Sequence, residues 1–423
     1  MRVLMVSWEY PPVMVGGLGR HVHSLATELV AAGHEVVVLS RQPTGTDAAT
    51  HPSVEEVLDG VRVLRVAEDP AHLEFERDMV AWTLAMGHGL LRAALTRLCP
   101  GWRPDVVHAH DWLVAHPAIA LADVLEVPLV ATIHATEAGR YSGWLSSPLS
   151  RQVHSTEWWL ARRADTVITC SAAMRDEVAE LFDLDPGPIA VLRNGIAPRG
   201  WRAAPGMVEA ASRRYAPRGE PLLLYFGRLE YEKGVQDLIA AMPRIRRANP
   251  GTRLLVAGTG TATDMLVETA RTHRVRRSVR FLGHLPDAEL AALLMAVAAV
   301  VLPSRYEPFG IVALEAAAAG APLVASTAGG LSEVVLDGET GLSFAPGDVA
   351  GLAEAVGTVL ADPVAARARA AAATARLAND FSWSEVAVST AAVYAASVYT
   401  AAAAGGPIEL GRPKIPTGNV FGR

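Results

Sequence analysis

The chain has 423 residues, a length that favours two or more domains. Hydrophobic residues make up 51% of it and charged residues 19%, which excludes a wholly disordered chain. The formal net charge is -6, from 38 Lys and Arg against 44 Asp and Glu. This mildly acidic balance argues against bulk nucleic-acid binding, which needs a surplus of cations to meet the phosphates.

The cysteine count and the apolar segments indicate the cellular setting. Cys99 and Cys170 are too few for a disulfide framework, and this fits a reducing compartment. The most apolar stretch, Leu290–Leu302, falls short of the ~20 residues that a membrane-spanning helix needs. The first residues lack the long apolar core and cleavage site of a signal peptide. We therefore expect a soluble cytoplasmic protein.

Short apolar runs alternate with longer helical patterns along the first half of the chain. The runs are rich in Val and Ile and nearly continuous, as is typical of strands buried on both faces of a parallel sheet. The alternation indicates repeated βαβ units. The predicted strands are Val3–Ser7, Glu35–Leu39, Val61–Val66, Asp105–His108, Pro128–Ile133 and Thr166–Thr169, and the helical patterns are Gly19–Ala31, Leu73–Leu98 and Pro148–Arg163.

The second half repeats this alternation after a stretch rich in Pro, Gly and Arg. That stretch, Ala197–Glu220, is predicted to be an interdomain linker. We therefore predict two similar-sized α/β domains with a cleft between them. The predicted strands are Leu222–Phe226, Arg253–Ala257, Val279–Leu282, Ala299–Leu302 and Leu323–Ala325, and the helical patterns are Val235–Ala248, Thr263–His273, Ala288–Val297 and Ile311–Ala319.

Two further helices and a tail follow. Val364–Leu377 is an Ala- and Arg-rich helical pattern, and Trp383–Tyr399 is a second one that carries aromatic residues. The tail from Gly405 contains Gly and Pro and little apolar content, so we expect it to be poorly ordered.

A glycine-rich segment follows the first predicted strand, where ligands bind in doubly wound sheets. Gly16 and Gly17 precede a helix, and glycine lets the backbone approach a ligand while a helix N-terminus favours anions. The segment is not a dinucleotide fingerprint, because Val22 stands where the third glycine belongs. An ordinary turn explains this motif equally well.

Two cations follow the first strand of the second domain. Arg228 and Lys233 lie between that strand and the next helix. Arg can grip a phosphate with two hydrogen bonds and Lys supplies a point charge, which suits a diphosphate. The alternative is a solvated loop in which both cations pair with Glu230 and Glu232.

The most specific segment is the one that carries Glu307 and Glu315. A strand ends, Glu307 appears, and a Pro-Phe-Gly turn leads into a helix with Glu315 on its otherwise apolar surface. The free amides of Gly310, Ile311 and Val312 would form another anion seat. An unpaired buried carboxylate is costly, so we expect Glu315 to have a hydroxyl or cationic partner. The alternative is a helix with one surface Glu.

Polar residues also end the strands of the first half. They are His108, His110, Asp111 and His134. His108 and His110 resemble a pair of metal ligands, but no clear third ligand accompanies them in the sequence. His134 is placed to donate hydrogen bonds into the cleft, although a lone histidine is more often structural.

Aromatic residues suggest two surfaces in the first half. Eight of the nine Trp residues lie at or before Trp201, which suits a carbohydrate acceptor in the first domain, although most of them are expected in the core. Arg151–Arg163 combines Trp158 and Trp159 with arginines, a pattern that suits weak peripheral membrane contact. A helix packed on the domain with exposed arginines is the favoured reading.

Taken together, these motifs resemble a known family. Glu307 and Glu315 lie within E-P-F-G-x-x-x-x-E, and with Arg228, Lys233 and the Gly16-Gly17 pair they resemble the GT-B retaining glycosyltransferases of family four and the related glycogen and starch synthases. The resemblance runs from Met1 to about Tyr399. It implies two Rossmann-like doubly wound domains facing across a cleft, 1–200 for the acceptor and 201–382 for the nucleotide sugar. The helix 383–400 would cross back to the first domain, and 405–423 would be a disordered tail.

The resemblance also implies roles for individual residues. Arg228 and Lys233 would hold the donor diphosphate, helped by the amides of Gly310, Ile311 and Val312 and by the Gly16-Gly17 loop. Glu315 would bind the ribose hydroxyls. Glu307 and His134 would contact hydroxyls of the donor sugar, and Asp111 would orient the sugar or the acceptor hydroxyl.

The implied reaction is metal-independent transfer of glucose from UDP-glucose or ADP-glucose to the 4-hydroxyl of an α-1,4-glucan with retention. The product would belong to glycogen or methylglucose lipopolysaccharide synthesis. Met14 replaces the lysine that bacterial glycogen synthases carry before this glycine loop, so the choice between UDP and ADP stays open. The alternatives are a maltose-1-phosphate synthase, a lipid mannosyltransferase, a nucleotide-sugar epimerase and a non-catalytic sensor. The oligomeric state is not predicted.

Overall fold

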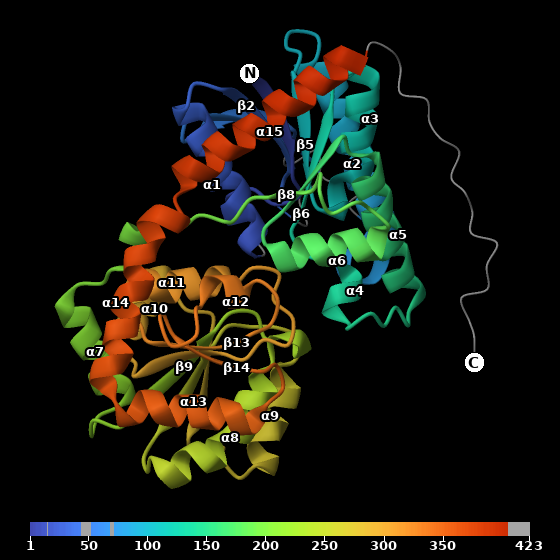
Figure 1. Ribbon diagram of the computed structural model, residues 1–423. Helices are drawn as coiled ribbons and strands as arrows, with labels where there is room; N and C mark the ends of the chain where they lie inside the picture. The colour runs from blue at the N-terminus through green and yellow to red at the C-terminus, as the bar shows by residue number, and fades with distance from the viewer. Residues whose placement is uncertain (15, 44–51, 68–71, 405–423) are drawn as a thin grey trace.

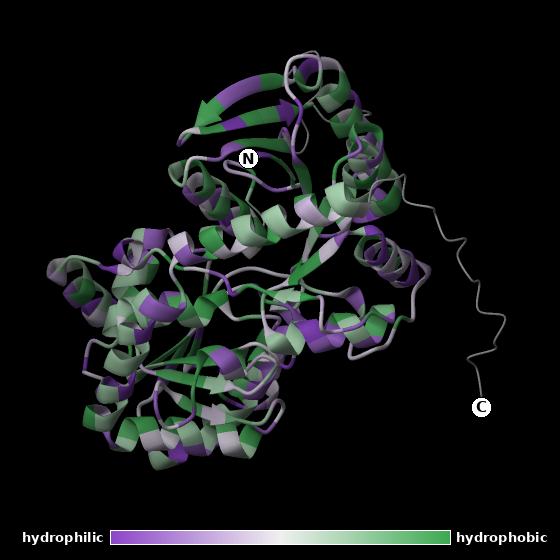
Figure 2. Ribbon diagram, turned by 45° about the horizontal axis from the view of Figure 1, so that its top comes forward, coloured by the Kyte–Doolittle hydropathy of each residue, from purple (hydrophilic) through white to green (hydrophobic). Residues whose placement is uncertain are grey.

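Two separate β-sheets, each covered by helices on both faces, organise the chain (Figure 1). The computed structural model describes residues 1–14, 16–43, 52–67 and 72–404. The predicted tail from Gly405 lies outside the described residues. In the lower lobe of Figure 2 mostly hydrophobic strands run through the middle, and hydrophilic residues lie on the helices around them. The predicted α/β class with two parallel sheets is confirmed.

The first sheet has eight strands in the order β3-β4-β2-β1-β5-β6-β7-β8, and all but β3 run parallel to their neighbours. The prediction missed β3 and β8, which are the two edge strands. The strand β3 reads Val-Glu-Glu-Val-Leu and is largely exposed, so it lacks the apolar run of a central strand. The bounds are β1 Arg2–Val6, β2 Glu35–Arg41, β3 Val54–Leu58, β4 Val61–Val66, β5 Val106–His110, β6 Leu129–Ile133, β7 Thr166–Thr169 and β8 Ala190–Val191.

Alternate side chains of the first sheet face opposite helical layers. Val3 and Met5 lie in one core cluster with residues of α1 and of the C-terminal helix α15, while Leu4 and Val6 lie in another with residues of α2 and α3. The predicted helix Leu73–Leu98 is divided, because α2 ends at Ala93 and one π-helical turn, η1, follows. The bounds are α1 Gly17–Ala31, α2 Phe75–Ala93, η1 Ala94–Leu98, η2 Trp112–Val114, α3 Ala115–Leu125, α4 Glu137–Arg140, α5 Pro148–Arg163 and α6 Ala172–Phe182.

The second sheet has six strands in the order β11-β10-β9-β12-β13-β14, and all of its pairs are parallel. The prediction missed only its short edge strand, β14. The bounds are β9 Leu222–Phe226, β10 Arg253–Ala257, β11 Val279–Gly283, β12 Ala299–Leu302, β13 Leu323–Ser326 and β14 Leu342–Phe344. Its helices are η4 Tyr231–Lys233, α8 Val235–Ala248, α9 Thr263–Thr272, α10 Asp287–Ala296, α11 Ile311–Ala319, α12 Leu331–Val334 and α13 Val349–Ala361.

The stretch predicted as a linker is mostly helical. It contains a 3-10 turn, η3 Pro198–Trp201, and the helix α7 Pro205–Tyr215, which packs against α10. Trp201 and Tyr215 are buried there. Two of the prolines that suggested a loop, Pro198 and Pro205, stand in the first turns of η3 and α7, where proline is tolerated because its missing N–H has no helical partner.

The chain returns to the first domain through its last two helices (Figure 1). Helix α14, Pro363–Asp380, contacts α11, and α15, Trp383–Ala404, lies along α1. Tyr394 of α15 bonds through its hydroxyl to Nδ1 of His108, at 2.7 Å. By length and composition alone, Pro363–Ala403 is apolar enough to cross a membrane, which the sequence reading did not anticipate. It is two helices interrupted at Phe381 and Ser382, and its apolar character comes largely from alanine.

Candidate functional site: the junction of the two domains

Lys233 and Glu307 form an ion pair in the second domain. The Nζ atom of Lys233 lies 2.8 Å from Oε2 of Glu307, and both side chains are largely buried. Gly234, which follows the lysine, has a φ of 68°, and a Cβ there would lie 1.9 Å from the carbonyl oxygen of Pro303. Only glycine fits this approach, and it brings the start of α8 against the end of β12. The two residues predicted to act together are therefore adjacent.

Arg228 is the more exposed of the two predicted cations. Its Nη2 atom lies 3.9 Å from Oε1 of Glu232, at the outer limit of an ion pair, and its side chain is 44% exposed. Glu230 bonds instead to Thr261. The alternative of a solvated loop with paired charges therefore describes Arg228, which lies beside Glu232. It does not describe Lys233, which pairs with Glu307.

The Pro-Phe-Gly turn places a helix N-terminus against the first domain. Gly310 has a φ of 102° and caps α11, so the first-turn amides of Ile311 and Val312 come directly after it. A Cβ on Gly17, at the start of α1, would lie 3.0 Å from Cδ1 of Ile311. The two predicted anion seats, one from each domain, therefore meet face to face.

Glu315 has the cationic partner that its burial requires, and this partner belongs to the other domain. Nη1 of Arg20, in the first turn of α1, lies 2.8 Å from Oε1 of Glu315. Burial raises the pKa of Glu315 to about 7, although Arg20 opposes this rise. The sequence analysis missed Arg20. Its position directly after the glycine loop was the available signal.

Asp111 and His134 are joined at the carboxyl end of the first sheet. Asp111 Oδ1 accepts a hydrogen bond from the backbone N–H of His134, at 2.7 Å. Burial raises the pKa of Asp111 to about 7. Its φ of 64° and ψ of 174° lie in a region that is essentially confined to glycine, and such strain at about 1–3 kcal/mol is typical of functional positions.

The segment around Glu307 also docks on the first domain through its neighbours. Tyr306 donates from its hydroxyl to Oε1 of Glu177, at 2.8 Å, and accepts from the backbone N–H of Thr136, at 3.1 Å. Ser171 Oγ donates to the carbonyl oxygen of Pro308, at 2.6 Å. These contacts hold the predicted donor residues against the predicted acceptor domain, and the sequence analysis did not single out any of them.

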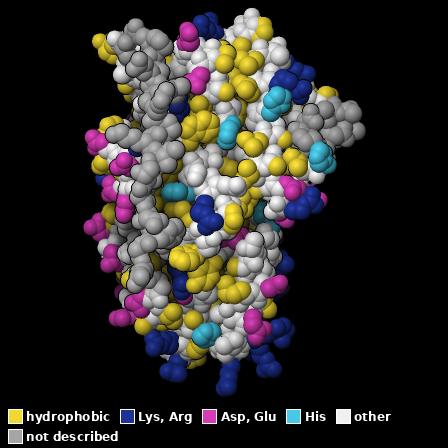
Figure 3. Space-filling model, turned by 90° about the vertical axis from the view of Figure 1, so that its right-hand side faces the viewer, with side chains coloured by type: hydrophobic (Ala, Val, Ile, Leu, Met, Phe, Trp, Pro, Cys, Tyr) yellow, Lys and Arg dark blue, Asp and Glu magenta, His cyan; other side chains and the backbone are white. Residues whose placement is uncertain are grey.

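A hollow of about 480 Å³ opens on the first domain beside η2. Its lining combines the indole of Trp112 with polar side chains of α2, α3 and α5, among them Thr83, His116 and Gln152. Hydrophobic, histidine and basic side chains are intermixed on the upper lobe of the face in Figure 3. Trp158 is partly exposed, and the guanidinium of Arg162 lies 5.5 Å from the centre of its ring.

The sequence matches two families that cover the two domains in turn. "Glycosyltransferase Family 4" matches residues 15–199, and "Glycosyl transferases group 1" matches residues 209–376. A protein of Mycobacterium tuberculosis described as "Glycogen synthase" is 62% identical over 399 residues, which cover 93% of this chain and 94% of that protein. The "Alpha-maltose-1-phosphate synthase" of Mycolicibacterium smegmatis is 31% identical and covers 93% of this chain and 99% of its own.

The fold has solved counterparts. The sucrose-phosphate synthase of Thermosynechococcus elongatus superposes with a TM-score of 0.78 at 25% identity, over 94% of this chain and 99% of its own. Together the two family models extend from residue 15 to residue 376, over both domains. Glycosyltransferases of this kind take their sugar from a nucleotide-sugar donor. The chain therefore belongs to the GT-B glycosyltransferases of family four and is a glycosyltransferase.

Proposed function

We propose that the protein is a retaining glucosyltransferase that moves glucose from UDP-glucose or ADP-glucose to the 4-hydroxyl of an α-1,4-glucan. The observation that carries this proposal is the ion pair of Lys233 and Glu307 beside the N-terminus of α11. The relative described as a glycogen synthase supports the choice of glucose and of a glucan, because it is 62% identical over nearly the whole chain. The product would be glycogen or the glucan of methylglucose lipopolysaccharides, made in the cytoplasm.

The leaving group is the nucleoside diphosphate. Negative charge develops on it as the bond from the anomeric carbon to the phosphate oxygen lengthens, and preorganised cations and amides stabilise that charge. Lys233 supplies a buried positive charge, and Ile311 and Val312 supply amides at a helix N-terminus. Arg228 is exposed enough to reach a second phosphate. These groups perform the role of a metal ion, so we propose that the transfer is metal-independent.

Donor binding rearranges the present ion pairs. A diphosphate beside Lys233 would compete with Glu307 for its ammonium group and free that carboxylate to accept hydrogen bonds from sugar hydroxyls. Glu315 would accept from the ribose hydroxyls in the same way, beside or in place of Arg20. His134 and Asp111 would complete the sugar site from the first domain. Glu307 and Glu315 are thus each held by a cation until the hydroxyls arrive.

The acceptor is proposed to bind on the first domain. The hollow beside η2 joins an indole face, that of Trp112, to several hydrogen-bonding side chains, and this combination suits a sugar chain. Trp112 directly follows Asp111, so an acceptor in this hollow would extend toward the donor sugar. A second candidate is maltose-1-phosphate synthesis, favoured by the relative of that description at 31% identity. It differs in acceptor, which would be glucose 1-phosphate.

Donor and acceptor profiling tests the proposal. ADP-glucose, UDP-glucose and GDP-mannose are each offered with maltooligosaccharides, with glucose 1-phosphate, and with no acceptor. We expect longer α-1,4-linked oligosaccharides with retained configuration from one of the two glucose donors. Maltose 1-phosphate as the sole product would favour the second candidate. Transfer from GDP-mannose alone, or a changed sugar without acceptor, would contradict both.

A further inference from the structure

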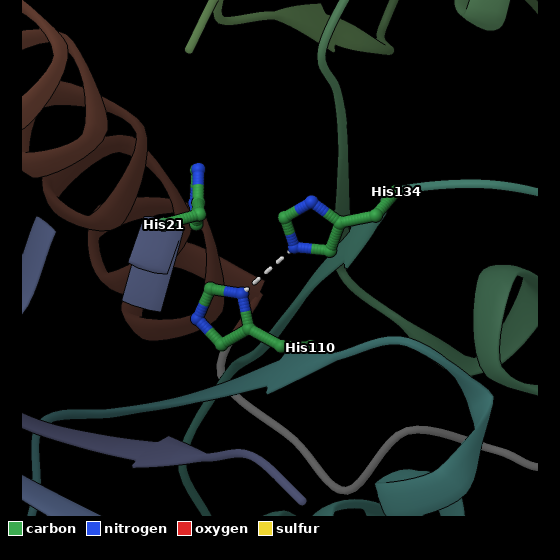
Figure 4. Close-up of side chains that lie close together, drawn as sticks. All are labelled: His21, His110 and His134. Atoms are coloured by element: carbon green, nitrogen blue, oxygen red, sulfur yellow. Dashed lines mark hydrogen bonds between the residues drawn. The ribbon is translucent and has the colours of Figure 1, made fainter. Parts of the chain in front are cut away.

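Three histidines lie close together where β5 and β6 end and α1 begins (Figure 4). His21 belongs to α1, His110 ends β5, and His134 directly follows β6. One ring nitrogen of each lies within 4.8 Å of the corresponding nitrogens of the other two. His21 and His110 are buried and His134 is half-buried, so the group lies inside the domain but has one member near the surface.

Asn194 determines which nitrogen of His21 carries the proton. Nδ1 of His21 lies 2.7 Å from Oδ1 of Asn194, and an amide oxygen accepts, so Nδ1 is the donor. The lone pair is therefore on Nε2. In the part of the chain that the structure describes, this buried Nε2 has no hydrogen-bond partner. A histidine oriented by a hydrogen bond through one nitrogen, with the other left free, is the usual arrangement of a metal ligand.

His110 and His134 have the spacing of two ligands on one ion. Nδ1 of His110 lies 3.2 Å from Nε2 of His134. Two nitrogens bound tetrahedrally to zinc at about 2.0–2.1 Å lie about 3.3 Å apart. One proton now lies between these two nitrogens. If it moves to the other nitrogen of its own ring, both lone pairs face the same point and no proton is lost.

The surroundings keep the three imidazoles neutral and in place. Burial lowers the pKa of His21 to about 3 and that of His134 to about 4, and it lowers the pKa of His110 well below the ordinary value. Protons therefore do not compete for the lone pairs at neutral pH. The indole of Trp383, from α15, packs edge-on against His21 with ring centres 5.4 Å apart, which limits rotation of that ligand.

We propose that His21, His110 and His134 form a binding site for one divalent transition-metal ion that prefers imidazole, such as Zn²⁺, with a fourth position left open. The sequence pattern paired His110 with His108, whereas the structure brings His110 together with His21 of α1 and with His134, which follows β6. His108 is not part of the site, because its two ring nitrogens bond to Tyr394 and Thr132, each at 2.7 Å.

An ion at this site would inhibit glycosyl transfer. It would bind the nitrogen of His134 and hold that ring away from the donor sugar. This consequence rests on the proposed role of His134, whereas binding of the ion does not. The site is also separate from the leaving-group chemistry at Lys233, for which the proposed function invokes no metal.

Calorimetric titration of the full chain with ZnCl₂ after chelator treatment tests the site. The variants His21→Gln and His110→Gln remove one ligand each, and His88→Gln, at an exposed position on α2, is the matched control. We expect one Zn²⁺ per chain in the unaltered protein and in His88→Gln, and affinity lower by at least about tenfold in the other two. Visible absorption of Co²⁺ in the same variants reports on the ligand field directly.

The shift of the thermal unfolding midpoint on adding Zn²⁺ is a second measurement of binding, which can be used even if a ligand variant is less stable. Zn²⁺ is expected to raise the midpoint of the unaltered protein and of His88→Gln, since an ion that binds only the folded state stabilises it. Folded His21→Gln should show no such rise. Unchanged Zn²⁺ affinity in folded His21→Gln and His110→Gln, or no binding by the unaltered protein, would overturn the site. Binding without chelator-reversible inhibition would overturn the inhibitory consequence alone.

Discussion

The guanidinium of Arg20 lies 2.8 Å from the carboxylate of Glu315 and so connects the first turn of α1 to helix α11 across the two domains. Arg20 also lies 3.4 Å from Asp287, the first residue of α10. Arg20 is 46% exposed while Glu315 is buried, so water screens the pair on one side only. The link brings the proposed ribose-binding carboxylate and the glycine loop of the other domain together before the donor is bound.

Loss of Arg20 is expected to weaken donor binding. In Arg20→Ala the buried carboxylate of Glu315 loses its cation, so its pKa rises further and it is protonated at neutral pH. We expect a several-fold higher KM for the donor, with KM for the acceptor unchanged. Steady-state kinetics with each substrate varied in turn measures this. Arg20→Lys, which keeps the charge, is the control, and an unchanged donor KM in Arg20→Ala would contradict the link.

The pH dependence of donor binding follows from Glu315. Burial raises its pKa to about 7 from an ordinary value of 4.5, so the side chain loses its proton as the pH rises through 7. The ionised form accepts hydrogen bonds from ribose hydroxyls, and donor KM is therefore expected to fall as the pH rises from 6 to 8. The raised pKa of Glu315 also makes the folded state less stable as the pH rises from 4.5 to about 7. The reason is that the folded state binds the proton of Glu315 more tightly than the unfolded chain does.

Glu315→Gln is the matched control for this titration. Glutamine has the same shape but does not ionise in this range. Its donor KM should be higher at pH 8 and should lose the slope attributed to Glu315. A slope that persists unchanged in the variant assigns the titration to another group.

Tyr306→Phe is expected to loosen the contact between the domains. The variant removes the hydroxyl that donates to Glu177 and accepts from the N–H of Thr136. Loss of these bonds in a buried setting should lower the free energy of unfolding by about 1–3 kcal/mol. Urea unfolding followed by circular dichroism measures the change. Tyr141→Phe, at an exposed tyrosine, should leave stability unaltered, and equal stability of the two variants would refute the role of Tyr306.

The lysine content offers a chemical test of the donor site. Lys233 and Lys414 are the two lysines of the chain. An amine-reactive reagent is therefore expected to mark few positions, and a bound nucleoside diphosphate should protect Lys233. Peptide mapping by mass spectrometry, with Lys414 as the internal reference, measures the protection. Equal labelling of Lys233 with and without UDP and ADP would argue against a diphosphate at this residue.

The sequence predicted the central strands and the residues that lie close together within one domain. Lys233 and Glu307 were predictable because both follow strands whose carboxyl ends meet at one edge of the sheet. The edge strand β3 was not, because Glu55 and Glu56 interrupt its apolar pattern. The sequence predicted that Glu315 would have a hydroxyl or cationic partner, but it did not identify Arg20, which is 295 residues away and belongs to the other domain.

Contacts between the two domains were the features that the sequence did not predict. Tyr306 stands beside the recognised motif, but its role depends on Glu177 of α6, which no spacing in the sequence connects to it. The histidine group has the same origin, because His21, His110 and His134 come from three separate elements. Periodicity predicts each element, whereas the packing of one element on another decides which side chains meet.

The turnover number of Lys233→Ala, measured with the preferred glucose donor and a maltooligosaccharide, tests the central claim most directly. Loss of this charge at the leaving diphosphate should lower kcat by about 100-fold in a protein that remains folded by circular dichroism. Arg247→Ala, an exposed cation on α8, should retain the full rate. Turnover of folded Lys233→Ala equal to that of Arg247→Ala would contradict the claim that Lys233 stabilises the departing diphosphate.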